Sequence, residues 1–137
     1  MTLFAFTDGA SRNNPGEAGI GVVIKNENGE IVLTTKKYLG LTTNNIAEYS
    51  ALIFCLETLL ASKTVSCSAL VVHTDSELMA RQISGIYKVK DERLKVLHQK
   101  VKTLLASATF SFSIKHIPRA QNKEADLLAN EAIDSKC

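Results

Sequence analysis

Residues 69–77 (ALVVHTDSE) decide the fold, because they join a compact apolar run to an aspartate. A short apolar run of this kind is typical of a strand that is buried on both faces of a sheet. Two earlier segments, Gly19–Ile24 and Ile31–Tyr38, are also predicted strands, and the Asn28-Gly29 pair between them is a hairpin signal. The buried strand therefore belongs to a sheet that contains a hairpin.

The other elements follow from patterns of apolar residues along the chain. We expect strands at Leu3–Asp8, Gly19–Ile24, Ile31–Tyr38, Ala69–Thr74 and Thr109–His116, and helices at 45–61, 75–83, 90–106 and 122–133. This order predicts an α/β fold with a five-stranded mixed sheet, in which three antiparallel, hairpin-linked strands precede parallel crossovers and helices cover both faces. No linker or repeat interrupts the chain, so we expect a single domain over residues 1–137.

Composition excludes several classes of protein. The chain has 137 residues, of which 45% are hydrophobic and 22% are charged, as in globular domains. It has no apolar run long enough to span a membrane, and its N-terminus lacks the basic region and apolar core of a secretory signal. We therefore expect a soluble, cytoplasmic protein. The cysteines Cys55, Cys67 and Cys137 do not have zinc-binding spacing, and a disulfide between Cys55 and Cys137 stays open.

Charge is unevenly distributed, although the net charge is only +2. Residues 81–102 hold seven basic and two acidic side chains, a local charge of +5. Residues 41–80 hold one lysine and four acidic side chains, a local charge of −3. A basic strip beside an acidic centre favours a polyanion held next to metal-binding carboxylates, although a solvated helix face would explain the basic strip equally well.

Four carboxylates lie where predicted elements end or begin. Asp8 ends the first strand, and Asp75 ends the buried strand. Glu48 lies in the first turns of the long helix, and Asp126 opens the last helix. If the first strand and the buried strand are parallel neighbours, Asp8 and Asp75 emerge side by side at the carboxyl edge of the sheet, where sites usually form. Because converging carboxylates repel one another, this pattern predicts divalent cations with oxygen ligands, Mg²⁺ or Mn²⁺.

Each acid also has a plain structural explanation. Asp8 could belong to a turn, and Asp126 could interact with the helix dipole. Asp75 could cap a helix, with Glu77 completing a capping box. Glu48 fits such a role least, because it lies at the edge of an apolar arc without a lysine or arginine three or four residues away. An unpaired carboxylate facing a core is costly unless a cation or a proton neutralises it.

Four motifs in order resemble the type 1 ribonuclease H family. They are FTDGASRNNPGEAGIG at 6–21, TNNIAEYSAL at 43–52, HTDSE at 73–77 and HIPRAQNKEADLLAN at 116–130. The set is far more specific than a lone TDG or TDS, because each motif contributes one acid. The resemblance implies the ribonuclease H fold and hydrolysis of the RNA strand of RNA/DNA hybrids by two Mg²⁺ ions, with Mn²⁺ as an alternative. It also implies products with 3′-hydroxyl and 5′-phosphate ends.

The resemblance further implies which residues form the site. The family's metal-binding acids fall on Asp8, Glu48, Asp75 and Asp126. Its hybrid-binding positions fall on Asn14, Thr43, Asn44 and Asn45, with Thr43 at a DNA-strand phosphate and the asparagines in the minor groove. Asparagine amides suit contacts to 2′-hydroxyls that do not read sequence. We expect Asp8 to bridge the two ions, because it lies at the centre of the predicted sheet.

This chain departs from the family pattern in three places. Many members have a histidine in a loop before the last acid; counting without gaps places His116 there, but we favour Arg119, which lies nearer the helix entrance. Glu77 stands near the substrate, where some relatives have glutamine. The chain has no tryptophan and therefore lacks the Trp-rich basic protrusion of some members. Lys88 and Lys90 would replace it in part, so we expect weaker hybrid affinity with a steep salt dependence.

Two other functions stay open. One is a non-catalytic module that binds hybrids or RNA, but a polyanion-binding surface would not be expected to retain four acids. The other is a nuclease that acts mainly on RNA duplexes. In each case the expected partner is nucleic acid, above all an RNA/DNA hybrid. We expect no membrane association, no obligate protein partner and a monomeric chain.

Overall fold

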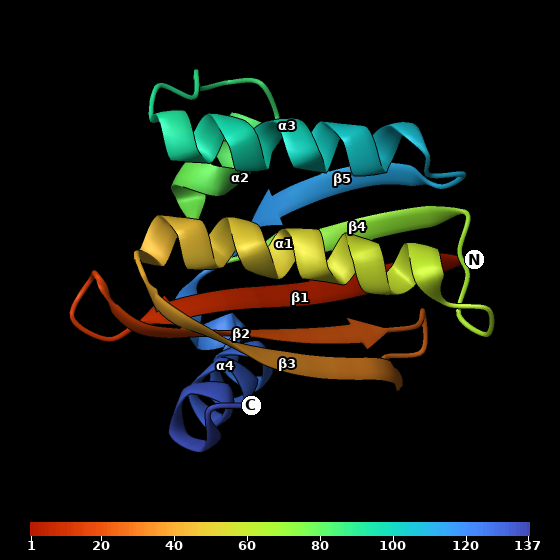
Figure 1. Ribbon diagram of the computed structural model, residues 1–137. Coiled ribbons are helices and arrows are strands. Elements are labelled where there is room, and N and C mark those ends of the chain that lie inside the picture. Colours follow the sequence, from red (N-terminus) through yellow and green to blue (C-terminus); the bar gives the residue numbers. More distant parts are fainter.

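The computed structural model describes residues 1–137 and consists of helices packed on both faces of one sheet (Figure 1). The strands are β1 (Thr2–Ser11), β2 (Gly16–Lys25), β3 (Ile31–Thr42), β4 (Ala69–Thr74) and β5 (Ser111–His116). The helices are α1 (Asn44–Ala61), α2 (Glu77–Ile83), α3 (Glu92–Ala106), the short 3₁₀ helix η1 (Arg119–Gln121) and α4 (Lys123–Ser135). None of them combines the length and the apolarity that crossing a lipid bilayer requires.

The order of strands in the sheet is β3-β2-β1-β4-β5. The first three strands pair antiparallel, while β4 pairs in parallel with both β1 and β5. This arrangement confirms the predicted fold class. The pairing of β1 with β4 ends at Thr7 and Thr74, so Asp8 and Asp75 are the first residues beyond it. Parallel pairing therefore places these two acids at the same edge of the sheet, as their positions in the sequence predicted.

The N-terminal strands are longer than predicted. β1 continues past Asp8 to Ser11, where it pairs with Ala18, and the connection between β1 and β2 is correspondingly short. Glycines, asparagines and a proline made residues 11–19 resemble one long turn. Gly21 lies within β2 rather than in a turn, and it makes room for α4, because a Cβ there would overlap the Ala125 carbonyl of that helix. Small residues in this strand therefore allow a helix to pack closely on the sheet.

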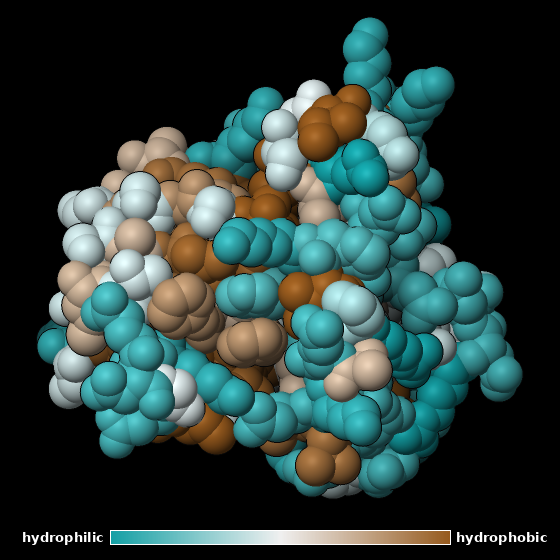
Figure 2. Space-filling model, turned by 180° about the vertical axis from the view of Figure 1, so that it is seen from behind, coloured by the Kyte–Doolittle hydropathy of each residue, from teal (hydrophilic) through white to brown (hydrophobic).

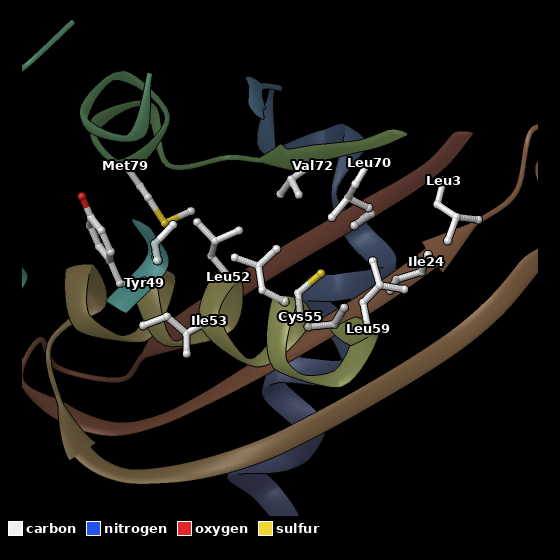
Figure 3. Close-up of a cluster of buried hydrophobic side chains, with 14 of the residues drawn as sticks. Leu3, Ile24, Tyr49, Leu52, Ile53, Cys55, Leu59, Leu70, Val72 and Met79 are labelled. Atoms are coloured by element: carbon white, nitrogen blue, oxygen red, sulfur yellow. The ribbon is translucent and has the colours of Figure 1, made fainter. Parts of the chain in front are cut away.

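The main core lies between the sheet and the layer formed by α1 and α3 (Figure 3). Leu3, Leu52 and Leu70 come from β1, α1 and β4, and each is almost completely buried. Cys55 points into this core, whereas Cys137 is exposed, and all three cysteines are free. The Cys55–Cys137 disulfide that the sequence left open is therefore not formed. α4 packs on the opposite face of the sheet, against β1, β2 and β3 (Figure 1).

Candidate active site

Three of the four predicted acids converge at the carboxyl edge of β1 and β4. Asp8, Glu48 and Asp75 each offer a carboxylate oxygen, and these atoms all lie within 4.8 Å of one another. They come from β1, from the first turns of α1 and from the residue after β4. Thr43 begins α1 as its N-cap, with Oγ1 accepting the Ile46 N–H at 3.3 Å, and so fixes where Glu48 lies along the helix.

Gly9 allows the α1 helix to approach the sheet closely enough for this cluster to form. A Cβ at Gly9 would overlap the backbone of Ala47 and Glu48. In the absence of a side chain, the Gly9 N–H donates a hydrogen bond of 2.9 Å to Glu48 Oε1. This contact orients the buried Glu48 carboxylate towards Asp8 and Asp75, and it is the only hydrogen bond from the backbone to that side chain.

Asp126 lies beside Asp8 and completes the acidic group. Its carboxyl group is close enough to Asp8 to share a hydrogen bond with it when one of the two is protonated. Asn130, one turn later on α4, donates to Asp126 Oδ1 at 3.3 Å. Asn122, just before α4, donates to the Thr7 carbonyl at 2.9 Å and so fixes the start of this helix next to β1.

Arg119 is the basic side chain nearest to the acids. One of its guanidinium nitrogens lies 3.7 Å from Asp126 Oδ1, and the side chain is 78% exposed. Asp8, Glu48 and Asp75 have no ion pair with any lysine or arginine. Their negative charge is therefore largely uncompensated by the protein itself.

Burial and mutual repulsion make the carboxyl groups of Asp8 and Glu48 strongly favour their protonated forms. Burial, and then the charges of Asp75 and Asp126, raise the pKa of Asp8 from 3.8 to about 9. Burial and the charges of Asp8 and Asp75 also raise the pKa of Glu48 well above its usual range, and the Gly9 hydrogen bond opposes this only in part. Such shifts for neighbouring carboxyls in a cleft are typical of functional sites.

A pocket of about 360 Å³ opens over the cluster. Its lining is almost entirely polar and consists of Asp8, Gly9, Ala10, Ser11, Asn44, Glu48, Asp75 and Arg119. The donor set at its base is made of carboxylate oxygens alone, which is the set that hard divalent cations such as Mg²⁺ and Mn²⁺ prefer. The uncompensated carboxylates and the open polar pocket therefore fit a metal site.

Asn44, a predicted substrate-binding residue, lines this pocket, and Asn14 joins its rim through a hydrogen bond to Asn44. Asn14 Oδ1 accepts the backbone N–H of Asn44 at 2.8 Å, and Asn44 Oδ1 accepts the Ser11 N–H at 2.8 Å. These hydrogen bonds connect the β1–β2 turn to the start of α1. Both asparagines retain free amide N–H groups on the surface, because the hydrogen bonds use only their side-chain oxygens.

Thr43 and Asn45 line a separate, smaller pocket between the starts of α1 and α3. Asn14, Ile46, Asp91, Arg93 and Leu94 complete its lining. Arg93, which the sequence indicated only as one charge of the basic strip, thus lies beside Thr43. Asn130 was not predicted as a site residue, although its spacing of four residues from Asp126 along a helix was a usable signal.

The remaining predicted residues lie away from the acids. His116 and Glu77 line a pocket between β5 and α2, and Glu77 is paired with Arg81 at 2.9 Å. Lys88 and Lys90 are exposed in the connection between α2 and α3. The alternative interpretation of Asp75 as a helix cap is wrong, because Ser76 caps α2 with its Oγ accepting the Met79 N–H at 3.1 Å.

Comparisons with known proteins agree with this architecture. A model of the family described as "Reverse transcriptase-like" matches residues 6–132. The chain is 44% identical to LC11-RNase H1, whose crystal structure was solved in complex with an RNA/DNA hybrid; the match has a TM-score of 0.91 and covers 98% of each chain. The chain belongs to the type 1 ribonuclease H family. The crystal structure of RNase H1 from Halobacterium salinarum NRC-1 matches with a TM-score of 0.90 at 38% identity, over 98% of this chain and 99% of that one.

The curated ribonuclease H relatives are longer than this chain. Ribonuclease HI of Halobacterium salinarum is 40% identical over 132 residues, which are 96% of this chain and 64% of that protein. A "Bifunctional protein" of Mycobacterium tuberculosis is 39% identical over 136 residues, 98% of this chain and 36% of that protein. The chain thus spans under two thirds of each of these two ribonuclease H relatives.

Replacing Asp8 with asparagine should stabilise the metal-free protein. Because the pKa of Asp8 is raised from 3.8 to about 9 on folding, the folded protein binds a proton that the unfolded chain lacks between these pH values. The wild type therefore loses stability as pH rises through this window, and the neutral amide removes the loss. Urea unfolding in EDTA should show Asp8→Asn more stable by at least about 2 kcal/mol at pH 8, with a smaller difference at pH 5.

Glu27→Gln is the matched control, because Glu27 is exposed in the β2–β3 turn. It should change the free energy of unfolding by less than about 0.5 kcal/mol at both pH values. A destabilised Asp8→Asn protein at pH 8 in EDTA would contradict the proposed repulsion among the carboxylates.

Proposed function

We propose that this protein is an endonuclease that hydrolyses the RNA strand of RNA/DNA hybrids and leaves 3′-hydroxyl and 5′-phosphate ends. The observation that carries this proposal is the convergence of Asp8, Glu48 and Asp75 within 4.8 Å, at the base of an open pocket and without a basic partner. Family membership supports it, since LC11-RNase H1 was crystallised with an RNA/DNA hybrid.

The cofactor that we propose is a pair of Mg²⁺ ions, with Mn²⁺ able to replace them. Asp8, Glu48, Asp75 and Asp126 would hold the ions, and Asp8 is central to this set because it interacts with both Asp75 and Asp126. Bound divalent ions would supply a nucleophilic water and stabilise the leaving 3′ oxygen. Hard cations of this kind take carboxylate oxygens as ligands, which is the donor set of this pocket.

The chain's own residues orient the site and the substrate. The Gly9 N–H holds the Glu48 carboxylate in place, and Asn130 holds Asp126. The Arg119 guanidinium, which lines the pocket, would contact the scissile phosphate and place it against the acids. An exposed guanidinium suits this role, because it is accessible to a phosphate that enters the pocket.

We propose that the hybrid lies across the rim formed by Asn14 and Asn44, with Asn45 beyond them. Their amide N–H groups would contact 2′-hydroxyls and minor-groove edges, which explains recognition of an RNA strand without a sequence preference. Thr43 would hold a phosphate of the DNA strand in the neighbouring pocket. Lys88 and Lys90 would add long-range attraction, which predicts binding that weakens steeply with salt.

We further propose that these residues act within a single domain, as a monomer, in the cytoplasm. All four acids and the substrate rim belong to one chain, so the site does not need a second copy.

A cleavage assay with three labelled duplexes tests the proposed function. In Mg²⁺, we expect the RNA strand of a hybrid to be cut, with an RNA duplex and a DNA duplex cut at least about a hundredfold more slowly. Asp8→Asn should lower the rate by a factor of about a thousand, because it removes a carboxylate that would hold the metal ions. Asp134→Asn, which changes an exposed acid on α4, should leave the rate unchanged.

Equal or faster cleavage of the RNA duplex would replace this proposal with a structured-RNA nuclease. Binding of the hybrid without cleavage of any duplex would indicate a non-catalytic module.

A second assay separates the roles of Arg119 and His116. Arg119 lines the acidic pocket, whereas His116 faces the pocket beside α2. Arg119→Ala should therefore lower the hybrid cleavage rate at least about tenfold, as expected for loss of a charged contact to the phosphate. His116→Ala should change it less than about threefold. The opposite order, or no effect of either change, would remove Arg119 from the proposed mechanism.

A further inference from the structure

The sheet has an uncovered region on the side that carries α4. α4 packs mainly on β1, β2 and β3, and so leaves β4 and β5 without a helix on this side. Strand alternation and register bring a defined set of side chains onto this surface, which we term the open face. Its residues are Phe4, Phe6, Val71, His73, Ser113 and Lys115. Seen from behind, this side of the molecule carries uncovered brown and tan side chains among teal ones (Figure 2).

Aromatic rings occupy the centre of the open face. The rings of Phe6 and His73, on the adjacent strands β1 and β4, are stacked with centroids 4.5 Å apart and planes at 11°. Phe4 lies next to His73, with centroids 6.3 Å apart. All three side chains are half-buried, so parts of their rings remain accessible. Aromatic side chains on the open face of a sheet are a common means of binding unpaired bases.

Cations flank these rings on both sides. The Lys25 ammonium lies 5.3 Å from the centroid of the Phe6 ring, and Lys115 is the register partner of His73 on β5. Lys123, at the start of α4, lines a pocket together with Phe6 and Lys25. The acid in this pocket, Glu124, is paired with Lys25 at 2.7 Å. The surface therefore has surplus positive charge on either side of the aromatic centre.

The open face also lies next to the proposed active site. Phe6 precedes Asp8 by two residues, and His73 precedes Asp75 by two, so one strand repeat of roughly 7 Å separates rings from acids. The short helix η1 lies between them. Arg119 at its start lines the acidic pocket, while its other residues line the pocket beside Phe6. A nucleic acid strand that passes Arg119 would therefore reach the open face.

We propose that the open face binds single-stranded nucleic acid, namely the unpaired flank of a strand that continues from the hybrid. Aromatic rings between cations favour a single strand over a duplex, because paired bases are hidden and offer the rings no stacking partner. The lysines would contact successive phosphates, while unpaired bases lie against the Phe4, Phe6 and His73 rings. The link to a hybrid flank rests on the proposed function; the binding of a single strand does not.

Fluorescence anisotropy with labelled oligodeoxythymidine of about 15 nucleotides, in EDTA, tests this proposal. We expect saturable binding to the full chain. Lys115→Glu and Lys123→Glu should each raise the Kd at least about fivefold, because each replaces a phosphate contact with a repulsive charge. Both lysines are exposed, so the variants should fold. Lys37→Glu makes the same charge change on β3, where Lys37 is exposed and lies over Phe54 of α1 on the opposite side of the sheet, and it should alter the Kd less than about twofold.

Ultraviolet crosslinking to the same oligonucleotide then locates the bound strand. Crosslinks should fall on peptides from β1 and β4, and Phe4→Ala should reduce them. Absence of saturable binding, equal weakening by Lys37→Glu, or crosslinks confined to the α2–α3 segment would each overturn the proposal. Cleavage of a blunt-ended hybrid by Lys115→Glu and Lys123→Glu is measured in parallel and should match the wild type. Binding in EDTA does not require catalysis. A failure of the proposed nuclease activity would therefore not change the expected binding of the single strand.

Discussion

Repulsion among buried carboxylates is the constraint on which the rest of this structure depends. Asp8 is only 4% exposed and Glu48 is 8% exposed, yet their oxygens lie close to each other and to Asp75. Such a cluster destabilises a protein without ligands, because desolvation of the carboxylates and repulsion between their like charges both oppose folding. The arrangement becomes favourable when positive charge enters the pocket, and the site is therefore built for a bound cation rather than for the empty protein.

The fold brings the acids together through strand pairing and the placement of α1. Parallel pairing of β1 and β4 places two of the acids at one edge, and α1 places the third above them. The close approach of α1 depends on the missing side chain of Gly9, and the start of α4 is fixed by the hydrogen bond from Asn122 to Thr7. These contacts are made by backbone groups and a buried amide, so the elements that carry the carboxylates are positioned before any ligand binds.

Most of the fold could be predicted from the sequence, because the apolar patterns of β4, α1 and α3 are strong and local. The ends of β1 and β2 could not, since small residues in a strand resemble a turn until the helix that packs on them is known. The edge position of Asp8 and Asp75 followed from topology. The Gly9–Glu48 hydrogen bond and the place of Arg93 did not, because each depends on how separate elements approach one another. The sequence favoured Arg119 over His116 because Arg119 lies nearer the helix entrance, and Arg119 lines the acidic pocket whereas His116 lines another.

Calorimetric titration of Mg²⁺ into the metal-free protein tests the central claim most directly. If the cluster is a cation site whose carboxyls are partly protonated at neutral pH, Mg²⁺ should bind saturably and release protons. The measured heat at pH 7 should then vary with the ionisation enthalpy of the buffer. Asp8→Asn should weaken the binding and reduce the proton release. Absence of magnesium binding at millimolar concentrations, or equal binding by Asp8→Asn, would contradict the account.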